Sequence, residues 1–218
     1  SLSYTLGFEF QDFVNDIPVI LGVTGFYTKL KDAYSENYVS SDGTIEFWER
    51  INNSGAKVKG IEIDFGIKPI RDLEFRSGLT YKSNKYDDRV KDFNTKNFLR
   101  TPDLFGYARI SYELTKSFSG FLSLKYTGEM YVPHEVIVDY QDEPILLLNK
   151  STDFFEIDIS ISKKFKIYDD IETEISAGVK NIFDAYQKDL DYGFKRDPGY
   201  VYGPSQPRTM FFSINLGF

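Results

Sequence analysis

The sequence predicts an all-β protein, built as an antiparallel meander of about nine strands, and two observations support this fold class. Stretch after stretch alternates apolar and polar residues with a period of two, as in a strand whose two faces meet different surroundings. Short and long polar connections also alternate along the chain. No comparable stretch keeps an apolar period near 3.6, so we expect helices to be minor at most.

Each predicted strand rests on its own alternation. The clearest covers residues 155–165, where Ile157 and Ile159 alternate with Asp158 and Ser160. The stretch 19–30 is the least regular. In order, the predicted strands lie at about 4–10, 19–30, 61–67, 73–82, 104–114, 122–126, 155–165, 171–179 and 210–218.

The connections between these strands alternate in length. Tight turns are predicted near 12–16, 68–72, 115–117 and 168–170. Longer polar segments lie near 35–43, 87–97, 131–150 and 183–206. A meander that crosses a membrane produces this rhythm, with tight turns on the periplasmic side and long loops outside. The Greek-key crossovers of a soluble sandwich give no reason for it.

The last predicted strand points to the same environment. Phe212, Ile214, Leu216 and Phe218 share one face, and the chain ends on the aromatic Phe218. Chain ends usually fray in water, whereas the final strand of an outer-membrane barrel is part of its wall. We therefore expect a transmembrane β-barrel in a bacterial outer membrane.

Composition narrows the function. No apolar run in the 218 residues approaches the roughly 20 that a spanning helix needs, which excludes a helical membrane protein. There are no cysteines, so disulfides and thiolate metal sites are excluded. The net charge of −7 argues against nucleic acid as a partner. No nucleophile–base–acid arrangement is visible, so we expect no enzyme, no catalytic residues and no cofactor.

Nine is an odd number of strands. A barrel of purely antiparallel neighbours closes only with an even number of strands. A free sheet edge in hydrocarbon leaves backbone amides without hydrogen-bond partners, and each such amide costs several kcal/mol. We therefore interpret the chain as part of a larger barrel. A small self-standing outer-membrane barrel and a soluble all-β binding module remain the alternatives.

Several short motifs resemble the C-terminal region of TonB-dependent outer-membrane receptors. Asn-Ile-Phe-Asp at 181–184 resembles the family's N-L/I-F-D near the end of the penultimate strand. Gly-Pro at 203–204 with Pro-Arg-Thr at 207–209 resembles its G-P-x-R-T, with two extra residues. Asn53 to Ala56 followed by Gly60 and Glu62 resembles its N-x-G-x…G-x-E strand, and Thr101-Pro102 its T-P before a descending strand.

The resemblance implies a parent receptor with a plug inside a 22-stranded barrel. Such a receptor binds a scarce nutrient, such as an iron–siderophore, haem or cobalamin, and imports it with energy from the TonB complex. Residues 1–218 would be the last nine strands, with the plug domain absent. The implied partners are outer-membrane lipid, the rest of the barrel and plug, the TonB complex and a small-molecule nutrient.

The last long connection holds most of the candidate ligand contacts. Aromatic and arginine side chains on an outward loop suit ligand capture, since they give contact area at little entropic cost. The alternative is that they pack the loop and the interfacial girdle. The ligand-binding candidates are Tyr186, Tyr192, Phe194, Arg196, Tyr200 and Tyr202, together with the lone histidine, His134, which could contact haem iron or another metal.

A second set is predicted to be structural, bonding backbone at the barrel rim or forming the last strand. It comprises Asn181, Phe183, Asp184, Gly203, Pro204, Arg208, Thr209 and Phe218. The acidic residues Asp139, Asp142 and Glu143 lack the spacing of a calcium loop, so no metal site is predicted.

Overall fold

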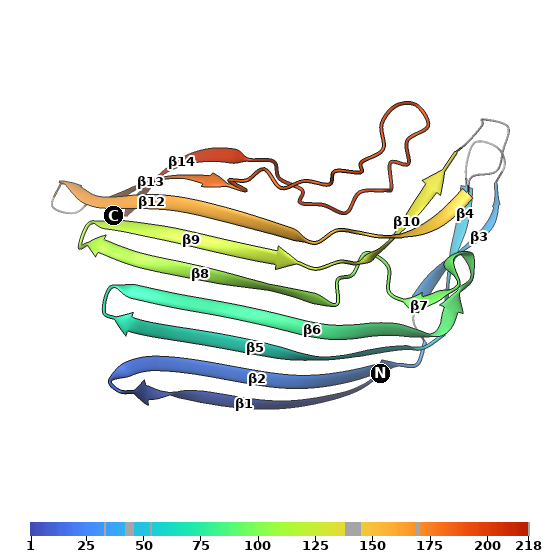
Figure 1. Cartoon of the computed structure of the whole chain (residues 1–218), viewed down its shortest axis with the longest axis horizontal. Helices are drawn as coiled ribbons and strands as arrows, with labels where there is room; N and C mark the ends of the chain where they lie inside the picture. The colour runs from blue at the N-terminus through green and yellow to red at the C-terminus, as the bar shows by residue number, and fades with distance from the viewer. Residues whose placement is uncertain (33, 42–45, 53, 138–144, 169–170, 218) are drawn as a thin grey trace.

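The computed structural model describes residues 1–32, 34–41, 46–52, 54–137, 145–168 and 171–217. Across these residues nine strands follow one another in chain order, each antiparallel to the next, which confirms the predicted meander (Figure 1). They are β1 (Leu2–Val14), β2 (Ile17–Leu30), β5 (Ala56–Ile70), β6 (Leu73–Val90), β8 (Leu104–Thr115), β9 (Phe118–Thr127), β12 (Phe154–Tyr168), β13 (Ile171–Lys180) and β14 (Thr209–Gly217).

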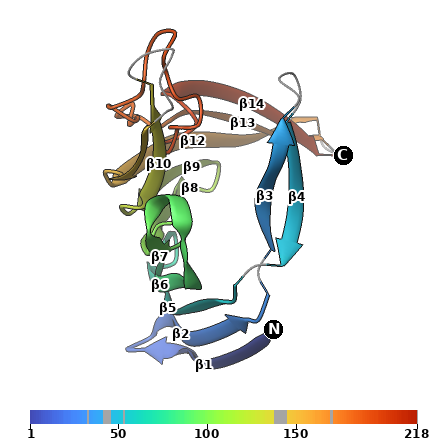
Figure 2. The same ribbon diagram turned by 90° about the vertical axis from the view of Figure 1, so that its right-hand side faces the viewer.

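The long connections contain secondary structure that the sequence did not predict. A hairpin of β3 (Tyr34–Ser41) and β4 (Glu46–Asn52) projects away from the sheet between β2 and β5 (Figure 2). A second hairpin, β10 (Tyr131–Val136) with β11 (Ile145–Lys150), lies between β9 and β12. After β6 come the 3₁₀ turn η1 (Lys91–Phe93) and the short β7 (Thr95–Asn97), which pairs with β6.

The tight turns lie at the opposite end of the strands from these hairpins (Figure 1). Between β1 and β2, Asn15 and Asp16 both have positive φ, 50° and 65°. Two left-handed residues in a two-residue turn match the right-handed twist of the hairpin, and Asn and Asp tolerate that conformation. The turns at 71–72 and 116–117 are equally short, while residues 169–170 of the fourth predicted turn lie outside the described residues.

The strand register joins the apolar positions into one continuous face. Residues opposite each other on neighbouring strands point to the same side of a sheet. One row crosses seven strands through paired residues: Ile67, Phe75, Ile110, Leu122, Ile159, Val179 and Met210. The alternation in the sequence therefore corresponds to a real two-sided sheet.

Along the middle of the strands, the opposite face carries the charged side chains. Arg76 is paired in register with Arg109, and the Lys125 ammonium lies 2.9 Å from a carboxylate oxygen of Glu156 on β12. Asp64 and Asp158 share this side, since they alternate with Ile63 and Ile157.

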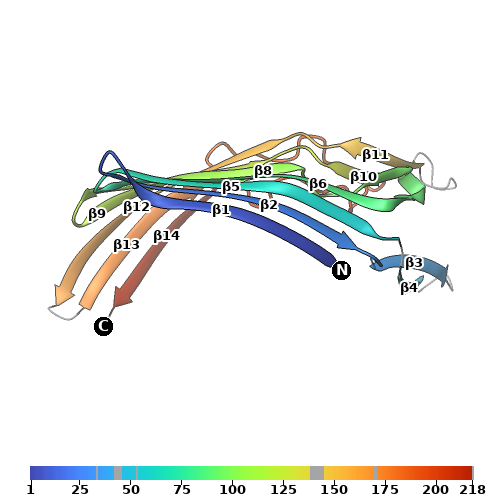
Figure 3. The same ribbon diagram turned by 90° about the horizontal axis from the view of Figure 1, so that it is seen from below.

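No second layer of the described chain covers the apolar face. The sheet is a single layer bent into an open trough (Figures 2 and 3). Leu6 on β1 is 82% exposed and Phe212 on β14 is 64% exposed. A soluble sandwich would bury such residues against a facing sheet.

The sheet does not close on itself. β1 and β14 stand at its two ends, and each pairs with one neighbour among the described strands. No helix in the described part of the chain is long and apolar enough to cross a membrane.

Candidate ligand-binding site

The last long connection, residues 181–208, leaves the sheet at the end of β13 and folds beside the β10–β11 hairpin before it enters β14 (Figure 1). This loop has three parts: a turn at its base, a middle section docked on the hairpin, and an exposed tip.

The base is organised by Asn181, which is buried and has a φ of 48°. Its side-chain amide donates to the carbonyl oxygens of Ala185 and Gln206, both at 2.9 Å, and its Oδ1 accepts from Ala185 N–H at 2.8 Å. Asp184 Oδ1 accepts from the backbone N–H of Arg208 at 2.8 Å. These bonds join the two ends of the loop where they leave and re-enter the sheet.

The middle section is held together by Gln187. Its buried side chain donates to the Tyr200 carbonyl and accepts from the Tyr202 N–H, each at 3.0 Å. Gly203 lies so close that an added Cβ would come within 2.8 Å of the Gln187 backbone nitrogen. A larger residue at 203 would therefore push the two sides of the loop apart.

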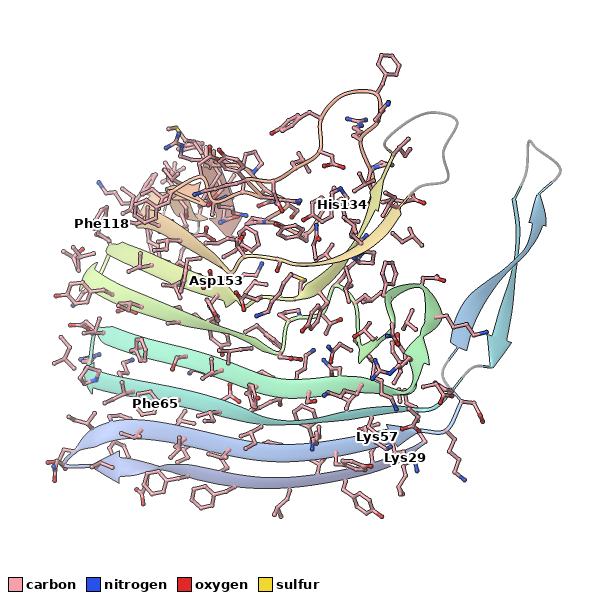
Figure 4. All side chains as sticks on the ribbon, turned by 45° about the vertical axis from the view of Figure 1, so that its right-hand side comes forward. Lys29, Lys57, Phe65, Phe118, His134 and Asp153 are labelled. Carbon is pink, nitrogen blue, oxygen red and sulfur yellow. The ribbon has the colours of Figure 1, made fainter. Side chains whose placement is uncertain are left out.

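Tyr200 anchors this section on the β10–β11 hairpin. It is 2% exposed and forms a small core with Met130 and Val132, against which Tyr202 also packs. Its ring stacks on that of His134, which belongs to β10 and is labelled in Figure 4.

Polar groups surround the stacked rings. The Asn149 amide donates to His134 Nδ1 and to the Tyr200 hydroxyl oxygen, both at 3.1 Å. His134 Nε2 then carries the proton toward Asp191 Oδ2 at 2.8 Å. The Tyr200 hydroxyl donates to Asp189 Oδ2 at 2.7 Å, and the Tyr202 hydroxyl donates to the other oxygen of Asp189.

These contacts shift the titration of the groups involved. For Asp189 partial burial acts to raise the pKa, but the hydroxyls of Tyr202 and Tyr200 stabilise the carboxylate and hold its pKa below the usual value. The hydrogen bonds from His134 and from the backbone of Asp197 lower the pKa of Asp191. Burial, followed by the bond to Asp189, raises the pKa of both tyrosines.

The tip of the loop is exposed. Phe194 is 100% exposed, Tyr192 and Arg196 are exposed, and Gly193 has a φ of 83°. Tyr186 is exposed nearer the base. The predicted ligand contacts therefore fall into two places: His134, Tyr200 and Tyr202 come together inside the docked section, and the other four do not join them.

The remaining predicted structural residues lie along the loop base. Phe183 is exposed, Pro204 is half-buried beside Gly203, and the Thr209 hydroxyl donates to the Pro207 carbonyl at 2.8 Å. Arg208 reaches the Ile182 carbonyl at 3.5 Å. Phe218 lies outside the described residues.

A metal bound at His134 would have to displace an existing hydrogen bond. Asn149 and Asp191 already occupy its two ring nitrogens. Within the described ranges no group of three or more His, Cys, Asp or Glu side chains could hold a metal ion. Asp139, Asp142 and Glu143 fall in 138–144, outside those ranges.

The polar partners Asn149, Gln187, Asp189 and Asp191 were not predicted from the sequence. Gln187, Asp189 and Asp191 are common loop residues with no motif around them, and the Asn-Lys-Ser triplet at 149–151 does not point to a loop contact. The one signal was their position: three of them stand between the candidate aromatics of the last loop. Polar residues interleaved with aromatics can satisfy tyrosine hydroxyls when a loop folds inward.

Comparison with known proteins agrees with this architecture. The family model described as "TonB dependent receptor-like, beta-barrel" matches residues 1–182. The chain therefore belongs to the β-barrel family of TonB-dependent receptors. That family consists of outer-membrane receptors and transporters rather than enzymes, as the sequence predicted. No curated protein sequence matches the chain.

Solved structures share the fold at low sequence identity. The ferric-catecholate import receptor Fiu of E. coli K12 is 19% identical, with a TM-score of 0.64 over 99% of this chain and 27% of Fiu. A mutant of the ferric enterobactin receptor PfeA from Pseudomonas aeruginosa, in complex with enterobactin, is 16% identical, with a TM-score of 0.67 over 99% of this chain and 31% of PfeA.

The copper transporter OprC is also 16% identical, with a TM-score of 0.63 over 99% of this chain and 32% of OprC. The chain thus spans between about a quarter and a third of the length of these receptors.

Proposed function

We propose that residues 1–218 form the last nine strands of a 22-stranded receptor barrel in a bacterial outer membrane. The earlier strands and the plug domain belong to a longer protein. The complete receptor captures a scarce nutrient outside the cell and imports it with energy from the TonB complex.

One observation carries the membrane placement. The apolar face runs without interruption through the strand register from β1 to β14, and nothing in the described chain covers it. Soluble monomers rarely expose apolar patches beyond a few hundred Å². Hydrocarbon is the environment in which such a face is stable, so the lipid of the outer membrane is its partner.

The free edges support incorporation into a larger barrel. β1 and β14 each have a neighbour on one side only among the described strands. Unpaired amides are untenable in hydrocarbon, so both edges need strands from the rest of the receptor. This argues against the self-standing small barrel, and the uncovered face argues against the soluble binding module.

Ligand capture is assigned to the exposed tip of the last loop. Tyr192, Phe194 and Arg196 present two aromatic rings and a fixed positive charge to the outside. Tyr186 is exposed closer to the barrel rim and extends this surface. His134, Tyr200 and Tyr202 instead hold the loop in place, because their polar atoms already have protein partners.

The proposed nutrient is a chelated metal, with an iron–siderophore favoured over haem or cobalamin. Fiu and PfeA are named as ferric-catecholate and ferric enterobactin receptors. Ferric siderophores that carry net negative charge and aromatic rings would find an arginine and two aromatic rings at the tip.

Uptake by the complete receptor tests the proposal. Cells that depend on it for iron should grow on a ferric catecholate only while the TonB complex is intact. The triple variant Y192A/F194A/R196Q should weaken binding of the ferric catecholate by about tenfold or more, since aromatic and arginine anchors dominate binding energy. The matched control K188Q/V201A changes two other exposed residues of the same loop and should bind normally.

Two results would contradict the proposal. Uptake that persists without the TonB complex would remove the active-transport role. Equal binding by the triple variant and the control would remove the loop tip as the capture surface.

A further inference from the structure

Four lysines gather on the apolar face at the end of the sheet that bears the long connections. Lys29 on β2 is paired in register with Lys57 on β5, and Lys57 with Lys85 on β6. Lys59 lies two residues further along β5. Figure 4 shows Lys29 and Lys57 near one another at these strand ends. We call these four residues the lysine row.

The period of two places the lysine row on the hydrocarbon side of the sheet. Along β5, Lys57 and Lys59 have the same parity as Ile61 and Ile63, and all four lysines are exposed. Lysines on the apolar face can be accommodated only where the face leaves the hydrocarbon, with the ammonium extended toward the headgroups.

A band of tyrosines lies between the lysine row and the aliphatic part of this face. Tyr4 is paired with Tyr27, and Tyr81 with Ile61. Along their strands, Tyr27 lies two residues from Lys29 and Tyr81 lies four residues from Lys85, toward the middle of the sheet. Tyrosine rings favour the membrane–water interface because one end is apolar and the other is wet. The band therefore fixes the depth of the lysine row at the headgroups of the outer leaflet.

The lysine row is locally cationic in a chain whose net charge is −7. Among the described residues, one carboxylate, that of Asp87, forms an ion pair with the lysine row, at Lys57. Four lysines against this carboxylate leave a local excess of positive charge, which an anionic partner would balance.

A groove of about 960 Å³ adjoins the lysine row on the same face. Its lining includes Lys59 of the lysine row, together with Tyr27, Tyr81 and Gly25. Gly25 is paired with Leu6 on one side and Ile61 on the other, so its missing side chain leaves a dent between two apolar neighbours. An acyl chain fits such a dent.

We propose that this strip binds a phosphorylated lipid of the outer leaflet. The ammonium groups of Lys29, Lys57, Lys59 and Lys85 contact the headgroup phosphates, and an acyl chain lies in the groove at Gly25. The inference goes beyond nutrient uptake and rests on the proposed membrane placement. Clusters of four or more lysines at a membrane surface attract anionic lipids, and the attraction is weakened by salt.

The test uses the complete receptor, purified in a neutral detergent, and diphosphoryl lipid A as the probe. Native mass spectrometry measures the fraction of receptor with bound lipid across a titration. The variant K29Q/K57Q/K59Q/K85Q should bind at least about tenfold more weakly than wild type. Raising the ionic strength should weaken binding by wild type more than by this variant.

The control removes four lysines from the other end of the strands. K68Q/K116Q/K163Q/K164Q makes the same change in net charge close to the short turns, and Lys163 lies on the apolar face. This control should bind the probe as wild type does. Equal losses in the two quadruple variants would overturn the lysine row as the site and leave general electrostatic attraction.

Two further arms separate the sources of failure. Inorganic phosphate at millimolar concentration should not displace the lipid; displacement would show a free-phosphate site and overturn the lipid assignment. Fractionation of cells shows whether both variants reach the outer membrane. A wild-type receptor absent from that fraction contradicts the proposed function itself, whereas normal insertion with unchanged lipid binding by K29Q/K57Q/K59Q/K85Q contradicts the lipid site alone.

Discussion

Tyr200 lies face to face with His134: their ring centroids are 3.8 Å apart and their planes differ by 11°. The two residues belong to different long connections, and this contact joins the last loop to the β10–β11 hairpin. The stack and its hydrogen bonds give the exposed tip a fixed support. A preorganised loop binds its ligand with a smaller entropic cost.

Replacing Tyr200 should release this support in two stages. Tyr200→Phe keeps the stacked ring but loses the bonds to Asp189 and Asn149, at a cost of about 1–2 kcal/mol. Tyr200→Ala also removes a buried ring, for which about 3–5 kcal/mol is typical. Hydrogen exchange of residues 186–203 measures the local opening. Equal protection in both variants would contradict separate contributions of the ring and the hydroxyl to loop stability.

The docked loop should have an acid limit and an alkaline limit. The lowered pKa values of Asp189 and Asp191 mean that their contribution is complete above the ordinary carboxyl range, about pH 4, and is lost as pH falls through the lowered values. The raised pKa values of Tyr200 and Tyr202 mean that the contribution of these hydroxyls to loop stability is complete below about pH 10 and is lost as pH rises further. Proteolysis within the loop, measured against pH, should stay slow between these limits.

Asp191→Asn is the control for the acid limit. An amide oxygen can still accept from His134, but it does not titrate. Loop opening in this variant should begin at a different pH or depend less steeply on pH than in wild type. An unchanged acid profile would show that Asp191 does not contribute to the limit.

The two faces of β12 should differ in their tolerance of charge. Ile159 lies in the apolar row between Leu122 and Val179, whereas Ser160 points to the other side. Ile159→Arg near the middle of the bilayer should cost about 2–4 kcal/mol, while Ser160→Arg should be tolerated. Urea unfolding of the complete barrel in lipid vesicles measures both, and equal losses would contradict the assigned faces.

The nine-strand meander was predictable because each strand has one apolar and one polar face. In β12, Ile157 lies on the apolar face and Asp158 on the polar face, and the same alternation recurs in the other strands of the sheet. The hairpins β3–β4 and β10–β11 lie beyond the sheet end, where no such contrast repeats along the chain. A segment such as 131–136, with Pro133 and His134 in its middle, carries no clear period of two, and its strands form through pairing with a distant segment.

The sequence predicts the aromatic candidates of the last loop, but neither their polar partners nor their division between an exposed tip and a docked section. Tyr192, Phe194, Tyr200 and Tyr202 have the same chemistry in the sequence, yet the structure exposes the first two and packs the other two. The difference comes from contacts with His134 and Asn149, which are far away in the chain and close only after β10, β11 and the last loop have assembled.

Asn181 should be the residue at the loop base least tolerant of change. Its side chain makes three hydrogen bonds with Ala185 and Gln206, and Asn181 adopts the left-handed conformation that asparagine tolerates better than most residues. Asn181→Ala leaves those backbone groups without partners and strains the turn, so we expect a loss of about 2–4 kcal/mol. Asn181→Asp retains the acceptor for the Ala185 N–H but loses both donors, and should fall between wild type and Asn181→Ala. Urea unfolding of the complete barrel ranks the three proteins, and a ranking in which Asn181→Ala matches wild type would show that the Arg208–Asp184 contact alone holds the loop base.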